Sequence, residues 1–332
     1  MKILVVSDAW YPQINGVVNT ISCTTTCLET LGHQVIMLTP NKFRTFPCPT
    51  YPEIRLSIFP KNGVEEFLRH QDYDAIHIAT EGPLGIATRN YAVRNKLKFT
   101  TAFHTKFPDY VKARTGLPVS ITYAFLRWFH KYSEAVLAPT TSIIKELKYY
   151  RIANPVYWPR GVETKLFIPF SNCKYNKETV YLYVGRIAVE KNIEAFLSLD
   201  LEGRKIVVGD GPLLSKLKSA YPDVTFLGKK NKSELPKIYN QADVFVFPSL
   251  TDTFGLVLLE AMACGVPVAA FPAAAPVEVI GDSKAGYVSE NLSEAVKVAL
   301  GISRKVARTH AETYSWHEAT RLFLKYQLKI KN

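Results

Sequence analysis

The sequence predicts an α/β protein with two parallel-sheet domains, and three observations support this prediction. The chain has 332 residues, which is the length of about two domains. Apolar runs at 2–8 and 179–185 are typical of strands buried on both faces of a parallel sheet. Helix-like segments separate such runs from the next apolar run, so both halves of the chain have the pattern of βαβ units.

The composition indicates the class of partner. A formal net charge of +12 favours anionic partners, namely phosphates, nucleic acid or a membrane surface. Residues 86–151 hold twelve basic and three acidic side chains, interleaved with aromatic residues. For any single helix of this segment, a solvated face over core aromatics is the better explanation. The excess of basic residues over the segment as a whole favours docking on anionic lipid. Because no known nucleic-acid-binding motif is present, we expect no nucleic-acid partner.

Cysteine usage and the first residues indicate the compartment. The five cysteines are an odd number without zinc-site spacing, which favours a reduced cytoplasmic protein. They are Cys23, Cys27, Cys48, Cys173 and Cys264. The first residues, MKILVVSDAW, resemble a strand rather than a signal peptide, and no apolar run approaches ~18 residues. We therefore expect a cytoplasmic protein, peripheral on the inner face of the cell membrane.

The first predicted unit runs from a strand at 2–8 through a helix ending near Gly32 to a strand at 35–38. It lacks G-x-G-x-x-G, so a dinucleotide site is not predicted. Gly16 opens the helix, where the missing side chain lets a phosphate or sugar approach the backbone. An ordinary helix start is the alternative.

The strands near 75–79 and 99–103 each run into a polar loop. Ligands of parallel sheets bind at such carboxyl ends, which makes Glu81 and His104 candidates. An imidazole there can exchange hydrogen bonds with a sugar hydroxyl, although a lone histidine is more often structural. Asp72 and Asp74 match the D-x-D pattern of metal-dependent transferases, but they precede a strand, so we do not expect a metal site there.

In the second half, a strand at 179–185 is followed by Arg186 and, five residues later, Lys191. Two cations directly after a buried strand favour an anion site, since guanidinium binds phosphate bidentately and the ammonium adds a point charge. Incidental surface charge is the alternative. A further strand, 205–208, ends in a glycine turn that contains Gly209.

The most informative stretch is 243–269, with a strand at 244–247, a polar loop at 251–255 and a helix at 256–263 closed by Gly265. Backbone N–H groups at such a helix start are suited to phosphate. Asp252 lies in the loop and Glu260 follows it by eight residues, so the two carboxylates are spaced to hold two ends of a sugar nucleotide. A plain strand–turn–helix is the alternative.

The segment TDTFGLVLLEA resembles the E-x7-E signature of retaining family 4 glycosyltransferases, with Asp252 in place of the usual first Glu. HTKFPDY (104–110), WPRGVE (158–163) and GRIAVEK (185–191) resemble further motifs of that family, so the resemblance covers nearly the whole chain. It implies the GT-B fold, with two Rossmann-like domains facing across a cleft. The implied domains are 1–168 for the acceptor and 169–314 for the nucleotide sugar, with a helix at 315–331 packing back on the first.

The resemblance also implies residue roles. The implied catalytic residues are His104, Asp252, Arg186 and Lys191. The implied donor-binding residues are Gly16, Arg186, Lys191, Gly209, Thr253, Phe254, Gly255, Leu256 and Glu260, and the implied acceptor-binding residues are Glu81 and Tyr110. Arg160 would face the cleft. The acceptor hydroxyl would attack from the leaving-group side, with the departing phosphate as base and without a cofactor or an obligatory metal.

The whole-chain pattern resembles bacterial enzymes that glycosylate diacylglycerol, for which UDP-glucose or a related UDP-sugar is the usual donor. This implies a nucleotide-sugar donor and a lipid acceptor at an anionic membrane surface. A GDP-mannose-dependent α-mannosyltransferase acting on a saccharide or another lipid is the first alternative. A sugar-nucleotide epimerase of the same architecture is the second.

Overall fold

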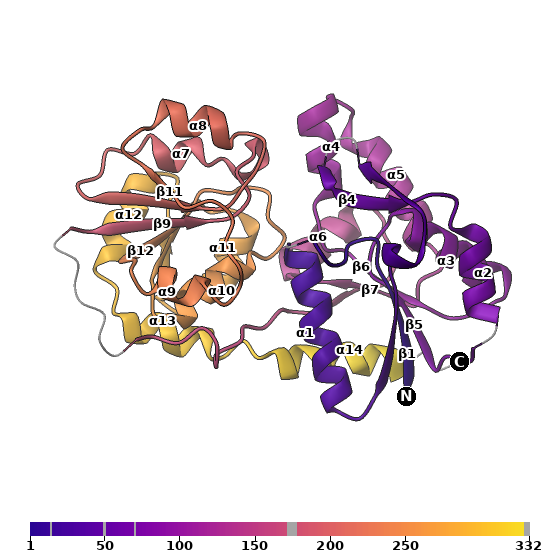
Figure 1. The fold of residues 1–332 in the computed structure, drawn as a ribbon. Helices are drawn as coiled ribbons and strands as arrows, with labels where there is room; N and C mark the ends of the chain where they lie inside the picture. Colours follow the sequence, from indigo (N-terminus) through magenta and orange to yellow (C-terminus); the bar gives the residue numbers. More distant parts are fainter. Residues whose placement is uncertain (14, 49–50, 70, 171–177, 329–332) are drawn as a thin grey trace. The chain divides into compact units, whose positions relative to one another are not determined.

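The computed structural model describes residues 1–332 except 14, 49–50, 70, 171–177 and 329–332 (Figure 1). The chain forms two compact units, Met1–Arg160 with Trp316–Asn332, and Gly161–Ser315. Each unit contains a six-stranded sheet whose strand pairs are parallel in the part of the chain that the structure describes. This is the α/β GT-B fold class that the sequence predicts.

The first unit has the strand order β2-β1-β5-β6-β7-β8. Its sheet strands are β1 (Lys2–Val6), β2 (Gln34–Leu38), β5 (Ala75–Ile78), β6 (Thr100–Ala102), β7 (Ala135–Ala138) and β8 (Pro155–Tyr157). Its helices include α1 (Gly16–Thr30), α2 (Lys61–Arg69), α3 (Pro83–Arg94), α4 (Phe107–Thr115), α5 (Val119–His130) and α6 (Thr141–Tyr149). A 3₁₀ turn, η1 (Pro40–Lys42), and a separate antiparallel hairpin of β3 (Thr45–Cys48) and β4 (Tyr51–Ser57) follow β2.

Strand β1 shows why this sheet is buried on both faces. Successive strand residues point to opposite faces, so Leu4 and Val6 enter one core cluster while Ile3 and Val5 enter another. The helix α14 (Trp316–Leu328) packs beside α1 on the second of these clusters (Figure 1). Residues 329–331 of the predicted C-terminal helix lie outside the described residues, as does Cys173.

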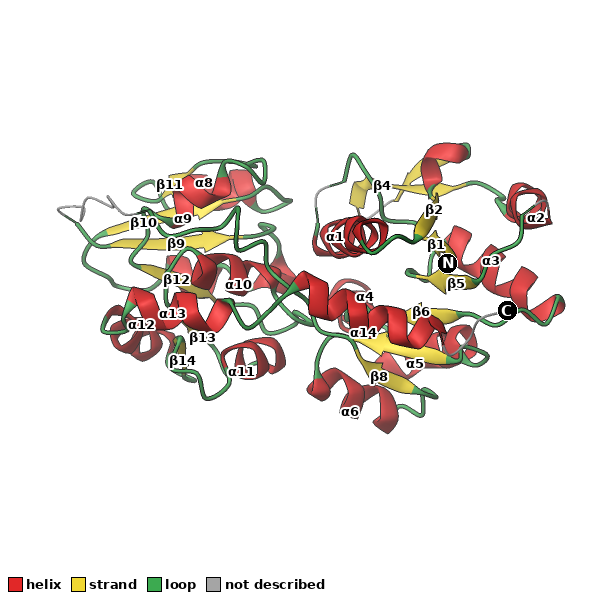
Figure 2. Ribbon diagram, turned by 90° about the horizontal axis from the view of Figure 1, so that it is seen from below, coloured by secondary structure: helices red, strands yellow, loops and turns green. Residues whose placement is uncertain are grey.

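The second unit has the strand order β11-β10-β9-β12-β13-β14, with helices on both sides of the sheet (Figure 2). Its strands are β9 (Val180–Val184), β10 (Arg204–Val208), β11 (Thr225–Phe226), β12 (Val244–Phe247), β13 (Val268–Ala270) and β14 (Gly286–Val288). Its helices are η2 (Val189–Lys191), α7 (Glu194–Leu197), α8 (Leu214–Ala220), α9 (Leu235–Tyr239), α10 (Leu256–Ala263), α11 (Ala274–Ile280), α12 (Leu292–Leu300) and α13 (Arg304–Ala311), counted over the described ranges.

The boundary between the units differs from the predicted one. The structure divides after Arg160, whereas the sequence motif suggested a division after residue 168. Phe167 is 1% exposed in the core of the second unit, and Val162 N donates to Tyr314 O at 3.1 Å. Burial of these side chains therefore assigns residues 161–168 to the second unit.

None of the helices within the described ranges is both long enough and apolar enough to cross a bilayer.

Candidate active site

The strand order of the second sheet brings two predicted loops together. Strands β10 and β11 follow β9 on one side and β12 lies on the other, so the order reverses between β9 and β12. Ligands of such sheets bind at the carboxyl ends of the strands that flank this reversal. Arg186 and Lys191 follow β9, and Asp252 follows β12.

Lys191 and Asp252 form an ion pair across these two loops. Their Nζ and Oδ1 atoms are 2.5 Å apart, and the side chains are only 17% and 19% exposed. A further bond joins the same loops, because Asn192 Nδ2 donates to Pro248 O at 3.2 Å. The other carboxylate oxygen of Asp252, Oδ2, is buried and accepts no hydrogen bond from the residues that the structure describes. That oxygen is suited to a ligand hydroxyl, since buried acceptors are normally satisfied.

The turn that carries Arg186 packs closely against the next turn of the sheet edge. Gly209 follows β10 with φ +143°, and a Cβ at this position would lie 1.8 Å from Gly185 O. Only glycine allows this approach. On the other side, Tyr183 Oη donates to Arg186 O at 2.7 Å. These contacts fix the backbone from which Arg186 projects.

Helix α10 begins at the same edge. Its N-cap Gly255 has the left-handed φ of +76°, and the first turn contains no charged side chain. Backbone N–H groups of this turn are therefore suited to an anion. Phe254 is 5% exposed and packs edge-to-face on Tyr314 at 6.1 Å between ring centroids, so only its main chain is placed for a donor contact. Thr253 precedes it in the loop, and Leu256 packs partly on the core.

Glu260 lies within α10 and is only 7% exposed. Burial raises the pKa of Glu260, and a hydrogen bond from Tyr239 lowers it in part. Tyr239 Oη donates to Glu260 Oε2 at 3.0 Å and so orients the carboxylate. Tyr239 is not predicted from the sequence, because nothing near α9 (Leu235–Tyr239) indicates that its hydroxyl reaches α10.

In the first unit, the order reverses between β1 and β5, and the buried Asp8 follows β1. Its carboxylate accepts hydrogen bonds from Leu84 N at 2.9 Å, Gly85 N at 3.2 Å and Thr80 Oγ1 at 3.0 Å. Burial raises the pKa of Asp8 to about 6. Asp8 therefore occupies the N-terminus of α3. This role of Asp8 was not predicted, although an aspartate directly after a buried strand is a signal for it.

His104 follows β6 and is partly buried beside Arg160. Arg160 Nη2 lies 3.3 Å from His104 Nδ1, and a guanidinium only donates, so Nδ1 accepts and the neutral ring carries its proton on Nε2. Burial, Arg160 and His77 lower the pKa of His104 well below its ordinary value. His104 is thus a neutral hydrogen-bond donor at neutral pH. Arg160, which the motif places toward the cleft, is 3% exposed and stacks 4.2 Å from the Trp158 ring centroid within the first unit.

The predicted Gly16 site is partly occupied by the chain itself. Gly16 begins α1, but Asn15 Oδ1 accepts from Val17 N and Val18 N at 3.0 Å each. An anion at this helix start would compete with the Asn15 side chain, so Gly16 offers close backbone approach rather than a full set of open donors.

The remaining predicted positions lie in the first unit. Glu81 precedes α3, and Tyr110 lies in α4 and is partly buried. Asp74 Oδ2 accepts from Lys2 N at 2.8 Å, at the start of β1. The D-x-D pattern therefore lies at the edge of the sheet opposite to Glu81 and His104.

Two family models match the chain. "Glycosyltransferase Family 4" matches residues 14–166, and "Glycosyl transferases group 1" matches residues 164–304. The GDP-mannose-dependent alpha-mannosyltransferase of Mycolicibacterium smegmatis is 27% identical over 316 residues, covering 87% of this chain and 84% of the relative. The sulfoquinovosyl transferase SQD2 of Arabidopsis thaliana is 29% identical over 364 residues, with 96% and 71% covered. The alpha-monoglucosyldiacylglycerol synthase of Acholeplasma laidlawii is 29% identical over 323 residues, with 81% and 79% covered.

Solved structures share the fold. Sucrose-phosphate synthase from Thermosynechococcus elongatus aligns with a TM-score of 0.76 at 21% identity, covering 99% of this chain and 96% of that chain. Anabaena HepE in complex with UDP and glucose aligns with a TM-score of 0.73 at 15% identity, covering 98% of each chain. Similarity at this identity shows the architecture alone. The two family models together match the chain from residue 14 to residue 304, and the chain belongs to the group 1 transferases of glycosyltransferase family 4, with the GT-B fold.

Proposed function

We propose that the protein is a retaining hexosyltransferase that moves a sugar from a UDP-sugar to a lipid acceptor, with diacylglycerol as the favoured acceptor. The observation that supports the donor site is the Lys191–Asp252 pair beside the start of α10. A cation and open backbone amides suit a diphosphate, while the carboxylate suits sugar hydroxyls. All three groups come from one edge of one sheet.

The proposed chemistry needs compensation for the charge of the leaving diphosphate. The acceptor oxygen bonds to the anomeric carbon on the face from which the diphosphate departs. The bond to the diphosphate breaks, and its oxygen takes the electron pair and the acceptor's proton. Arg186, Lys191 and the first amides of α10 would stabilise this charge, and preorganised groups of this kind supply a large part of catalysis. In this proposal the chain's own cations do so without an obligatory metal.

The remaining groups would orient the donor. Asp252 Oδ2 would accept from a sugar hydroxyl, and Glu260, held by Tyr239, would accept from the ribose hydroxyls. His104 would donate a hydrogen bond from Nε2 to a sugar hydroxyl. Because its lowered pKa keeps the ring neutral, it would not act as a general acid at neutral pH. Asp252 is one methylene shorter than the family's usual glutamate, so the sugar would bind closer to the loop.

The surface of α4, α5 and α6 supports a lipid acceptor. Exposed apolar and aromatic side chains there are Phe107, Leu117, Ile121, Trp128, Tyr132 and Tyr149. The exposed basic residues on the same helices and the loops beside them are Lys112, Arg127, Lys131, Lys145, Lys148 and Arg151. A cavity of about 310 Å³ is lined by two of these arginines and by Tyr149 and Tyr150. Cations near headgroups and rings at the interface suit peripheral binding to the anionic inner face of the cell membrane.

A transfer assay with the purified full-length protein tests this function. Diacylglycerol in mixed anionic micelles would be incubated with UDP-glucose, UDP-galactose or GDP-mannose, and the products read by mass and anomeric configuration. We expect an α-hexosyl-diacylglycerol from a UDP-sugar. Absence of lipid product from every UDP-sugar would overturn the proposal.

A second candidate is GDP-mannose-dependent α-mannosyl transfer to a saccharide or another lipid. It is favoured by the similarity to the GDP-mannose-dependent alpha-mannosyltransferase of Mycolicibacterium smegmatis. Product from GDP-mannose alone would select this candidate. Conversion of the sugar nucleotide with no acceptor consumed would instead indicate an epimerase.

A further inference from the structure

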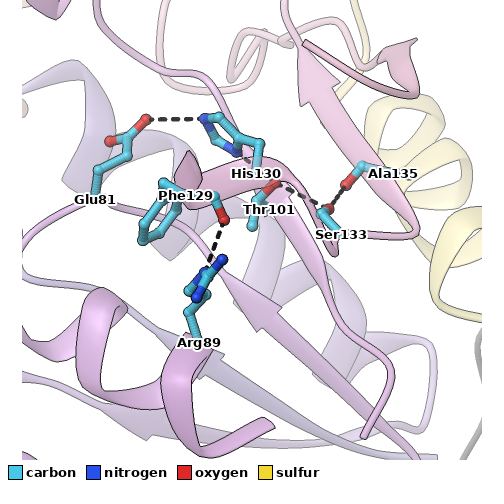
Figure 3. Close-up of polar contacts among 7 residues, drawn as sticks. All are labelled: Glu81, Arg89, Thr101, Phe129, His130, Ser133 and Ala135. Carbon is cyan, nitrogen blue, oxygen red and sulfur yellow. Dashed lines mark hydrogen bonds and ion pairs between the residues drawn. The ribbon is translucent and has the colours of Figure 1, made fainter. Parts of the chain in front are cut away.

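The hydrogen bonds around His130 determine which of its ring nitrogens carries a proton. Ser133 Oγ lies 2.6 Å from Ala135 O, and because a carbonyl only accepts, the serine donates there. Each hydroxyl has one hydrogen, so Thr101 Oγ1 donates to Ser133 Oγ, 3.0 Å away. His130 Nδ1 lies 2.8 Å from Thr101 Oγ1, whose hydrogen is already used, and therefore donates to it (Figure 3).

The other ring nitrogen of His130 faces Glu81. Nε2 lies 3.7 Å from Glu81 Oε1, with the histidine fully buried and the glutamate side chain 23% exposed (Figure 3). Since the first proton is on Nδ1, a neutral ring would direct a lone pair at the carboxylate, and only the imidazolium would attract it. A buried charge needs a partner, and Glu81 is placed to be that partner.

The surroundings contain charges of both signs. His130 is the last residue of α5, where the helix dipole favours a cation. Arg89, on α3, places a positive charge at the same helix end, which disfavours a second cation at His130. The Arg89 guanidinium donates to the carbonyls of Trp128 at 2.8 Å and Phe129 at 3.3 Å. Asp8, in the loop after β1, is a second carboxylate near Glu81. Glu81 is therefore repelled by Asp8 and attracted by a protonated His130.

We propose that His130 is a positioning residue for glycosyl transfer, whose protonated ring holds the Glu81 carboxylate ready to accept a hydrogen bond from the acceptor hydroxyl. This inference rests on the proposed acceptor role of Glu81. Glu81 stands at the carboxyl end of β5, the edge of the sheet where ligands bind. His130 is 0% exposed, so it acts on the substrate only through Glu81.

Acceptor kinetics test the positioning role. His130→Asn keeps an amide that donates to Thr101 and removes the group that faces Glu81. We expect the KM for the acceptor to rise about tenfold, within the range of coupling energies between residues in contact, while kcat and the donor KM change less than about twofold. His130→Gln, whose amide extends toward Glu81, regains part of the loss. The matched control is His317→Asn, from an exposed His317–Glu318 pair at 3.5 Å, and it leaves all three constants unchanged.

A double-mutant cycle distinguishes positioning from a general loss of packing. Glu81→Gln alone raises the acceptor KM, and His130→Asn added to it raises KM by less than about twofold, because the two residues act as one unit. If the two effects multiply, or if His130→Asn lowers kcat and donor affinity together with the melting temperature, the positioning role is wrong.

Nitrogen NMR of the His130 ring tests the pair without any acceptor. In the wild-type protein, under the conditions of the transfer assay, we expect a proton on Nε2 as well as on Nδ1, and in Glu81→Gln we expect the proton on Nε2 to be absent. An unprotonated Nε2 in the wild type overturns the inference whatever the acceptor is. A protonated ring in a protein that transfers to no lipid would mean that the acceptor assignment had failed and the pairing had not.

Discussion

Lys191 serves two partners in the proposed reaction, the Asp252 carboxylate and the donor diphosphate. Lys191→Ala removes a cation that acts on the leaving group and leaves Asp252 without its 2.5 Å partner. We expect kcat to fall by about 100-fold or more, the range for lost transition-state contacts. Lys191→Arg keeps the charge but not the ammonium geometry, so it retains an intermediate rate. Steady-state transfer kinetics measure both.

A matched control comes from the same unit. Lys216 forms a 3.6 Å ion pair with Glu194, and both side chains are more than half exposed. Lys216→Ala therefore changes neither kcat nor the donor KM. A Lys191→Ala enzyme as active as the Lys216→Ala enzyme would remove Lys191 from the proposed donor site.

At the residue scale, sequence predicts side chains that follow strand ends, and it does not predict their partners. Lys191 and Asp252 were predicted as parts of one site because each follows an apolar strand. Tyr239, Asp8 and His130 were not predicted. Their roles depend on contacts with residues more than twenty positions away, which only the folded chain brings together.

The turn after β10 is an element whose conformation depends on one residue. A Cβ at Gly209 would lie 1.8 Å from Gly185 O, in a backbone conformation of φ +143°. Gly209→Ala therefore has to move the turn that leads to Arg186. We expect a loss of unfolding free energy above about 3 kcal/mol, measured by denaturant titration, together with weaker donor binding.

Gly228 provides the control for Gly209. It also has positive φ, +67°, but a Cβ there meets nothing within 4 Å. Gly228→Ala should cost only about 1 kcal/mol, the usual cost of the left-handed region for a residue with a side chain. Equal costs for the two variants would show that close approach is not what requires glycine at 209.

Elements were predicted best where strand and helix patterns are strong. The helix predicted at 256–263 matches α10 (Leu256–Ala263), because an apolar run ends at a loop with glycine and the helix closes before Gly265. The β3–β4 hairpin was not predicted. Its strands contain Pro47 and Pro52 and pair with a register shift at Pro47/Cys48, so period-two alternation is weak there.

At the scale of the whole chain, the repeated strand–helix pattern was sufficient to predict two parallel sheets. Strand order was implied only by family resemblance, since periodicity carries no information about which strands are neighbours. The unit boundary was predicted too late, because the hinge motif ends in residues whose side chains pack into the second core. Phe167 is the main example.

Buried histidines and a buried aspartate change the unfolding free energy in opposite directions as pH falls. Burial and Arg160 lower the pKa of His77 from 6.5 to about 3, so the unfolded chain binds this proton first and the unfolding free energy falls as pH falls from 6.5 toward 3. The lowered pKa of His104 acts in the same direction. The pKa of Asp8 is raised from 3.8 to about 6, so protonation of Asp8 stabilises the folded chain as pH falls from 6 toward 3.8.

Between pH 6 and pH 4, each of these groups therefore changes the unfolding free energy by up to about 1.4 kcal/mol per pH unit, with the histidines and Asp8 opposed. We expect His77→Gln to make the loss of stability on acidification shallower by about that slope, and Asp8→Asn to make it steeper. Denaturant titrations at several pH values measure the change in unfolding free energy per pH unit. The variants are compared by this slope, because each substitution also changes the absolute stability. His317→Gln, at an exposed position of α14, should leave the slope unchanged. If Asp8→Asn and His77→Gln shift the slope in the same direction, the burial of one of the two groups does not control its protonation.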